Sequence, residues 1–118
     1  MEGLNTKGYF GDDRAMRLIK VEPELFQEIL LPTNFRGLTI EILAESNIVC
    51  GILDDENYQI FAEADSDTGI DKLAWAEDTS RHLFAFTPST HSHHWLILWN
   101  AYSDKPIVVV YAIAPEGS

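Results

Sequence analysis

Hydrophobic and polar residues alternate most clearly near the carboxyl end of the chain. From Trp95 to Trp99, the two tryptophans and Ile97 point to one face of an extended strand and two leucines point to the other. Because both faces are apolar, we expect a central strand. Ile107–Ile113 is rich in Val and Tyr, which suit a pleated sheet. The polar segment Ser103–Pro106 separates the two runs, and the pattern therefore predicts an antiparallel hairpin.

Shorter runs of the same kind fill the middle of the chain. Leu38–Leu43 alternates between aliphatic residues and Thr or Glu, which is the pattern of a half-buried strand. Ile48–Leu53 and Tyr58–Ala62 predict two further short strands, with turns between them at the polar residues 45–47 and 54–57. Short strands separated by turn signals are typical of a β-sandwich or barrel.

Two segments show no single period. Residues 24–31 lie between two prolines, and we interpret them as a strand, with a helix as the alternative. Residues 63–81 are acidic and poor in β-branched residues; they predict a long loop in which residues 71–77 form a helical turn. A loop of this length is uncommon unless it is functional or mobile. His82–Phe86 then resumes the strand pattern.

Together these elements predict an all-β fold, a single antiparallel β-sandwich of the jelly-roll kind with at most a short helical turn near residues 71–77. A length of 118 residues suits one domain. Residues 1–14 contain three glycines and predict a tail or an edge-covering segment, and residues 15–118 predict the sandwich domain. The expected core draws on four of the predicted strands: Leu38, Ile40, Ile42, Phe84, Phe86, Trp99 and Val109.

The net charge of the chain indicates which kinds of partner it can bind. The chain carries 19 Asp and Glu against 8 Lys and Arg, a formal net charge of −11. Its field opposes binding to nucleic acid or to an anionic membrane surface, and favours a basic partner or a divalent cation. No run approaches the roughly 20 apolar residues of a membrane span, and no signal-peptide pattern opens the chain, which predicts a cytoplasmic location. Cys50, the only cysteine, lies in an apolar run and predicts a buried structural thiol.

A histidine cluster is the most conspicuous candidate chemistry. His91 and His93 share one side of an extended strand, and with His94 they can offer imidazole ligands to Zn²⁺. His82 can join them only if its strand pairs with theirs. Jelly rolls of the cupin type use such a pair, but their motif adds a Glu and a later His that are absent after His94. The alternative is that the three histidines are solvated or form hydrogen bonds at a strand end.

Two further patterns suggest ligands. Asp65, Asp67 and Asp71 alternate around a glycine, as the oxygen ligands of Ca²⁺ do in a bent loop, although the spacing does not match an EF-hand. The alternative is a solvated acidic turn. Trp75 is a candidate for stacking on a sugar, whereas Trp95 and Trp99 are expected in the core. The sequence has neither a nucleophile motif nor a phosphate loop, and we assign no catalytic residue.

The carboxyl-terminal pattern Trp95–Asn100, followed by a polar turn and Val108–Tyr111, resembles the closing hairpin of GOLD-like β-sandwich domains. With the alternating strands before it, the resemblance covers roughly residues 37–114. It implies a jelly-roll-like sandwich used for protein contacts, and it carries over no functional residue. An immunoglobulin-like sandwich is the alternative, but the paired cysteines around a tryptophan are absent.

We therefore expect a non-catalytic, acidic binding module without a cofactor. Its expected partner is another protein or its own copy, through an exposed edge or face of the sheet. The first alternative is a divalent-metal site, holding Zn²⁺ or Ca²⁺ at the histidines or the acidic loop, with metal-dependent activity. The second alternative is a carbohydrate-binding module that uses Trp75 and the acidic loop.

Overall fold

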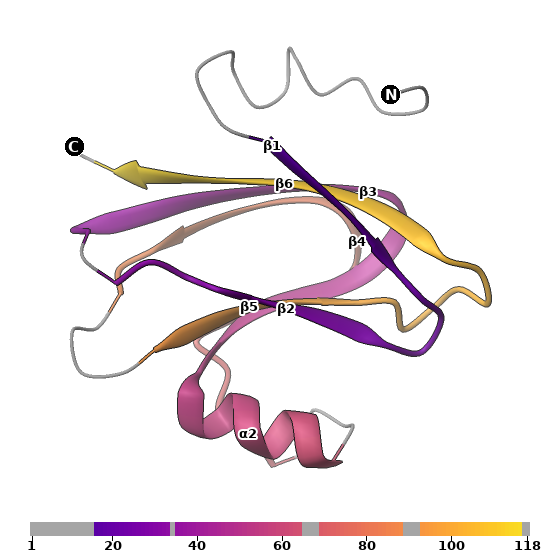
Figure 1. Cartoon of the computed structure of the whole chain (residues 1–118), viewed down its shortest axis with the longest axis horizontal. Helices are drawn as coiled ribbons and strands as arrows, with labels where there is room; N and C mark the ends of the chain where they lie inside the picture. Colours follow the sequence, from indigo (N-terminus) through magenta and orange to yellow (C-terminus); the bar gives the residue numbers. More distant parts are fainter. Residues whose placement is uncertain (1–15, 34, 65–68, 89–92, 117–118) are drawn as a thin grey trace.

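The computed structural model describes residues 16–33, 35–64, 69–88 and 93–116. These residues form six antiparallel strands in one sheet and a short helix (Figure 1), which confirms the all-β prediction. The elements in chain order are β1 (Met16–Val21), β2 (Phe26–Leu30), β3 (Gly37–Asp54), α2 (Asp55–Ala64), β4 (Ala74–Phe86), β5 (His94–Trp99) and β6 (Ile107–Glu116). No helix in this described part of the chain is long and apolar enough to cross a membrane.

The 18-residue strand β3 organises the sheet. Its residues 37–44 pair with β6 and its residues 49–54 pair with β5, so β5 and β6 follow one another along the same edge of β3. The predicted hairpin is therefore wrong, because the two strands pair with β3 and not with each other. On the far side, β1 pairs with β6 and β2 with β5, while β4 runs along the other edge of β3.

The sheet is bent across its middle, so that it has two halves (Figure 1). The upper half contains β1, β6, residues 37–44 of β3 and residues 81–86 of β4. The lower half contains β2, β5, residues 48–54 of β3 and residues 74–79 of β4. Side chains that point inward from both halves form the main core, which includes five of the seven expected residues: Leu38, Ile40, Ile42, Phe84 and Val109. Phe86 is half-buried at the margin of this core.

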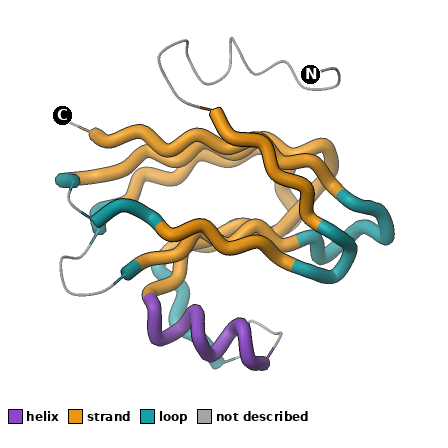
Figure 2. The backbone as a smooth tube through the Cα atoms, viewed as in Figure 1, coloured by secondary structure: helices purple, strands orange, loops and turns teal. Residues whose placement is uncertain are grey.

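Strand pairing is interrupted or shifts register where the sheet bends. We define the bend line by Glu22–Leu25, Glu45–Asn47, Asp78 and Asn100–Pro106. Figure 2 shows the first and last of these connections side by side, and the backbone of Asn100 exchanges two hydrogen bonds with Glu24 and Leu25. The predicted turn at residues 45–47 is therefore wrong: the polar triplet marks a bend in a continuous strand and does not reverse the chain.

Helix α2 replaces the predicted turn at residues 54–57 and the strand Tyr58–Ala62. The Asp54 carboxylate accepts a hydrogen bond from the backbone N–H of Asn57 at 2.8 Å, which caps the helix, and acidic residues occupy its first turn. Phe61 is fully buried, while Ile60 and Ala62 are exposed. The apolar positions thus follow the helical period, and the alternation in this segment was misleading.

The predictions for residues 24–31 and 71–77 have opposite outcomes. Residues 26–30 form β2, which confirms the strand interpretation over the helix. The helical turn expected at residues 71–77 is wrong, because β4 begins at Ala74 and pairs there with Ile52. Cys50 lies in the main core, where burial raises the pKa of its thiol to about 12.

The outer face of the lower half carries an aromatic cluster beneath α2. We use this name for Phe26, Tyr58, Phe61, Trp75, Trp95 and Trp99. The Phe61 ring centroid lies 4.7 Å from Phe26 and 5.5 Å from Trp99, and Trp95 donates a hydrogen bond to Asp55 in α2 at 2.9 Å. Trp99 is therefore half-buried under the helix. The prediction that Trp99 lies in the core between the halves is wrong.

Candidate functional sites

Strand β4 forms one border of the sheet. Among the described strands it pairs only with β3, so its other edge has no described partner. We call residues 81–86 of β4 the β4 edge. Natural proteins protect such edges with charges, prolines, bulges or short strands. In β4 the irregular pairing and acidic residues lie near Asp78, whereas the β4 edge contains no acidic residue and no proline.

The side chains of the β4 edge alternate between the two faces of the upper half. Phe84 and Phe86 point inward to the core, and Leu83 and Ala85 point outward. The Leu83 side chain is 60% exposed, the largest value among the exposed large hydrophobic residues. Met16 and Leu18 are also exposed on this outer face, at its opposite border on β1. The upper half thus presents aliphatic side chains at both borders.

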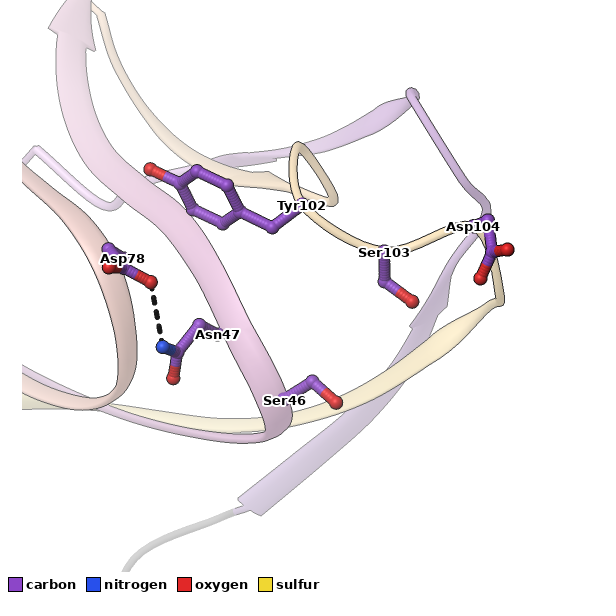
Figure 3. Close-up of a pocket in the computed structure, with 6 residues that line it drawn as sticks. All are labelled: Ser46, Asn47, Asp78, Tyr102, Ser103 and Asp104. Carbon is purple, nitrogen blue, oxygen red and sulfur yellow. Dashed lines mark hydrogen bonds between the residues drawn. The ribbon is translucent and has the colours of Figure 1, made fainter.

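A polar pocket of about 500 Å³ lies on the bend line (Figure 3). Ser46 and Asn47 come from β3, Asp78 from β4, and Tyr102 with two following residues from the β5–β6 connection. Asn47 donates a hydrogen bond to the Asp78 carboxylate at 2.7 Å, which ties β3 to β4 where Asp78 has a positive φ of 54°. The pocket offers hydroxyl, amide and carboxylate groups, so it can hold a polar ligand by hydrogen bonds.

The predicted histidine ligands occupy different environments. His91 lies outside the described residues, His93 is exposed, and His94 is only 3% exposed. The His94 ring packs against Phe86 at 5.0 Å, and its Nδ1 has no hydrogen-bond partner in the described part of the structure. Burial lowers the pKa of His94, against the opposing effect of Asp54. His94 is therefore a buried residue at the start of β5 and not a solvated loop residue.

His82 does not join the predicted cluster. It faces inward beside Phe84, with ring centroids 4.4 Å apart, and β4 does not pair with β5. Within the described ranges, no three His, Cys, Asp or Glu side chains converge as a metal site would require. Asp65 and Asp67 lie outside those ranges, and Asp71 is exposed with its backbone N–H donating to Asn57 at 2.9 Å. Zinc and calcium binding stay predictions.

Trp75, the predicted stacking residue, is half-buried. Its ring packs edge-on against Phe61 at 6.2 Å, and Lys72 lies 4.9 Å from the ring centroid. The Trp75 ring also occupies the space over Gly51, where an added Cβ would overlap it. Its Nε1 donates a hydrogen bond to Glu77 at 3.1 Å. These contacts give Trp75 a packing role, and sugar stacking stays a prediction.

Four residues of these sites were not predicted from the sequence: Leu83, Asn47, Asp78 and Tyr102. Leu83 lies in a strand that was predicted. The alternation of apolar and polar residues, however, does not show which strand lies at the edge of the sheet. The two polar turn signals at residues 45–47 and 103–106 do mark the bend line, but only the pairing along β3 brings them together. Compared with family models and with curated proteins, the chain matches neither a family nor a curated sequence.

Proposed function

We propose that this protein is a non-catalytic binding domain that pairs with a second copy of itself through the β4 edge. The observation that carries the proposal is the strand border at residues 81–86, where the backbone has no described strand partner and the Leu83 side chain is exposed. An added antiparallel strand would satisfy the backbone groups and cover the leucine. In this proposal the domain keeps the predicted jelly-roll-like sandwich and cytoplasmic location.

A second copy fits this edge in register. In an antiparallel pair centred on Leu83, this leucine meets its own counterpart and Arg81 stands opposite Ala85, both on the outer face. No like charges are opposed, and cross-strand aliphatic contacts stabilise such pairs.

The charge distribution permits this contact despite the net charge of −11. Acidic residues gather at the other end of the molecule, where Asp54, Asp55, Glu56 and Glu63 belong to α2 or precede it directly. Two copies joined at their upper halves keep these carboxylates apart, and salt screens what repulsion remains.

The test compares Leu83→Glu with Leu25→Glu, because Leu25 is similarly exposed (54%) but lies on the bend line. Light scattering after size exclusion should show a dimer for the wild type and for Leu25→Glu, and a folded monomer for Leu83→Glu, whose melting temperature should lack the concentration dependence of a dimer. A wild type that stays monomeric at high concentration, or a dimeric Leu83→Glu, would contradict the proposal.

A further inference from the structure

A second cavity, separate from the β4 edge and the bend line, opens between the two halves beside β1 and β2. This groove has a volume of about 480 Å³. Ile29, Tyr111 and Ile113 line it and pack against the main core. Leu30 and Phe35 also line it, and their side chains are 50% and 37% exposed. The groove thus combines a continuous apolar lining with apolar residues that remain in contact with solvent.

Among the described residues that line the groove, Arg17 is the one with a charge. It pairs with Tyr111 across β1 and β6, on the same inward-facing row of β1 as the buried Val21. The Arg17 side chain is exposed, and among the described residues no carboxylate forms an ion pair with it. In a chain with 19 acidic residues, an arginine without such a partner beside an apolar groove is available to an anionic ligand.

We infer that this groove binds a long-chain fatty acid. The acyl chain lies against Ile29, Leu30, Phe35 and Ile113, and the carboxylate pairs with the Arg17 guanidinium. Removal of the acyl chain from water supplies the non-directional attraction, and the two-pronged contact of a guanidinium with a carboxylate fixes its orientation. The volume is in the range of sites that hold small ligands, and none of the described lining residues is acidic, so none of them repels the carboxylate. This inference does not rest on the proposed function.

Laurate, used below its micelle concentration, is the probe, and isothermal calorimetry is the measurement. Wild type should bind laurate, and Arg17→Gln should bind it about tenfold to a hundredfold more weakly, the usual range for loss of a charge-assisted hydrogen bond. Arg17→Lys should bind with an affinity between those of wild type and Arg17→Gln, because it keeps the charge but loses the two-pronged contact. Arg36→Gln is the matched control, since Arg36 is also exposed but does not line the groove.

Dodecanol separates the role of the charge from that of the chain. It should bind wild type and Arg17→Gln equally, because it has the same chain length without the carboxylate. Absence of laurate binding to wild type, or laurate binding that Arg17→Gln leaves unchanged, would overturn the inference. Binding only to a variant that lacks residues 1–14 would identify that segment as the occupant, and would also overturn it.

Discussion

The two halves of the sheet share β3 and β4 but differ in what covers their outer faces. In the lower half, the outward residues of β5 are Trp95, Ile97 and Trp99, and α2 packs over them. In the upper half, the outward residues of β6 include Val110 and Ala112, and no described helix lies over that face. Both halves contribute inward residues to the same core, so the difference lies only in the outward rows.

This difference separates stability from recognition. Large aromatic side chains in the lower half bury much surface under a short helix, which would be marginal in isolation. In the upper half no described helix covers the outer face, although Val110 and Ala112 are buried there, and the border residue Leu83 stays exposed. In our proposal, the lower half supplies stability, and the β4 edge of the upper half remains available for pairing.

The largest expected effect comes from the centre of the aromatic cluster. Phe61→Ala should lower the free energy of unfolding by about 3–5 kcal/mol, because the Phe61 ring is fully buried and the space that it leaves cannot close completely. Leu83→Ala in the upper half should change this free energy by no more than about 0.5 kcal/mol when measured on the monomer. Urea unfolding followed by tryptophan fluorescence measures both. Equal losses in the two variants would remove the distinction between the halves.

A smaller effect is expected at the junction of the halves. The Asn100 side chain donates hydrogen bonds to the carbonyl oxygens of Val21 at 3.0 Å and Lys105 at 2.8 Å. These bonds link the end of β1 to the connection between β5 and β6. Asn100→Ala should cost about 1–3 kcal/mol for the buried Val21 carbonyl alone, which loses this donor. Asn47→Ala is the control, because its bond to Asp78 is exposed and should contribute less than about 1 kcal/mol. Similar unfolding midpoints for the two variants would refute a special role for Asn100.

Alternation along the chain was sufficient to predict two neighbouring strand segments in the upper half. Leu38–Leu43 and His82–Phe86 have this pattern, and both are strands that pair with each other. The same reasoning failed at residues 58–62, because a ten-residue helix offers too few positions to distinguish period two from period 3.6. The capping carboxylate of Asp54 was the available signal, and it was interpreted as part of a turn.

The hydrophobic periodicity of a strand, in contrast, does not determine which other strand it pairs with. Ser103–Pro106 suggested a hairpin, but β3 is long enough to pair with both β5 and β6, and the connection only spans the bend. The β4 edge and the bend-line pocket depend on this topology, so neither could be located from the sequence. Cys50 was predicted correctly because its apolar neighbours alone indicate burial.

The smallest effect expected concerns pH and belongs to His94, in the lower half. Burial lowers its pKa in the folded protein below the ordinary value of 6.5, so the folded state binds a proton less readily than the unfolded chain does. As pH falls below about 6.5, the unfolded chain gains a proton that the folded protein does not, and stability decreases. This loss ends once the pH is below the folded pKa, and His94 has no such effect well above 6.5.

Urea unfolding at about pH 7.5 and about pH 5.5 checks this dependence, in a range where histidines titrate and most carboxylates stay ionised. Wild type should lose stability on acidification, and His93→Gln should lose slightly less, because the neighbouring His93 contributes to the lowered pKa of His94. His94→Gln should lose less than either, because the titrating group is gone. A parallel decrease in all three proteins would show that His94 does not titrate differently on folding, and that the pH response of the lower half has another source.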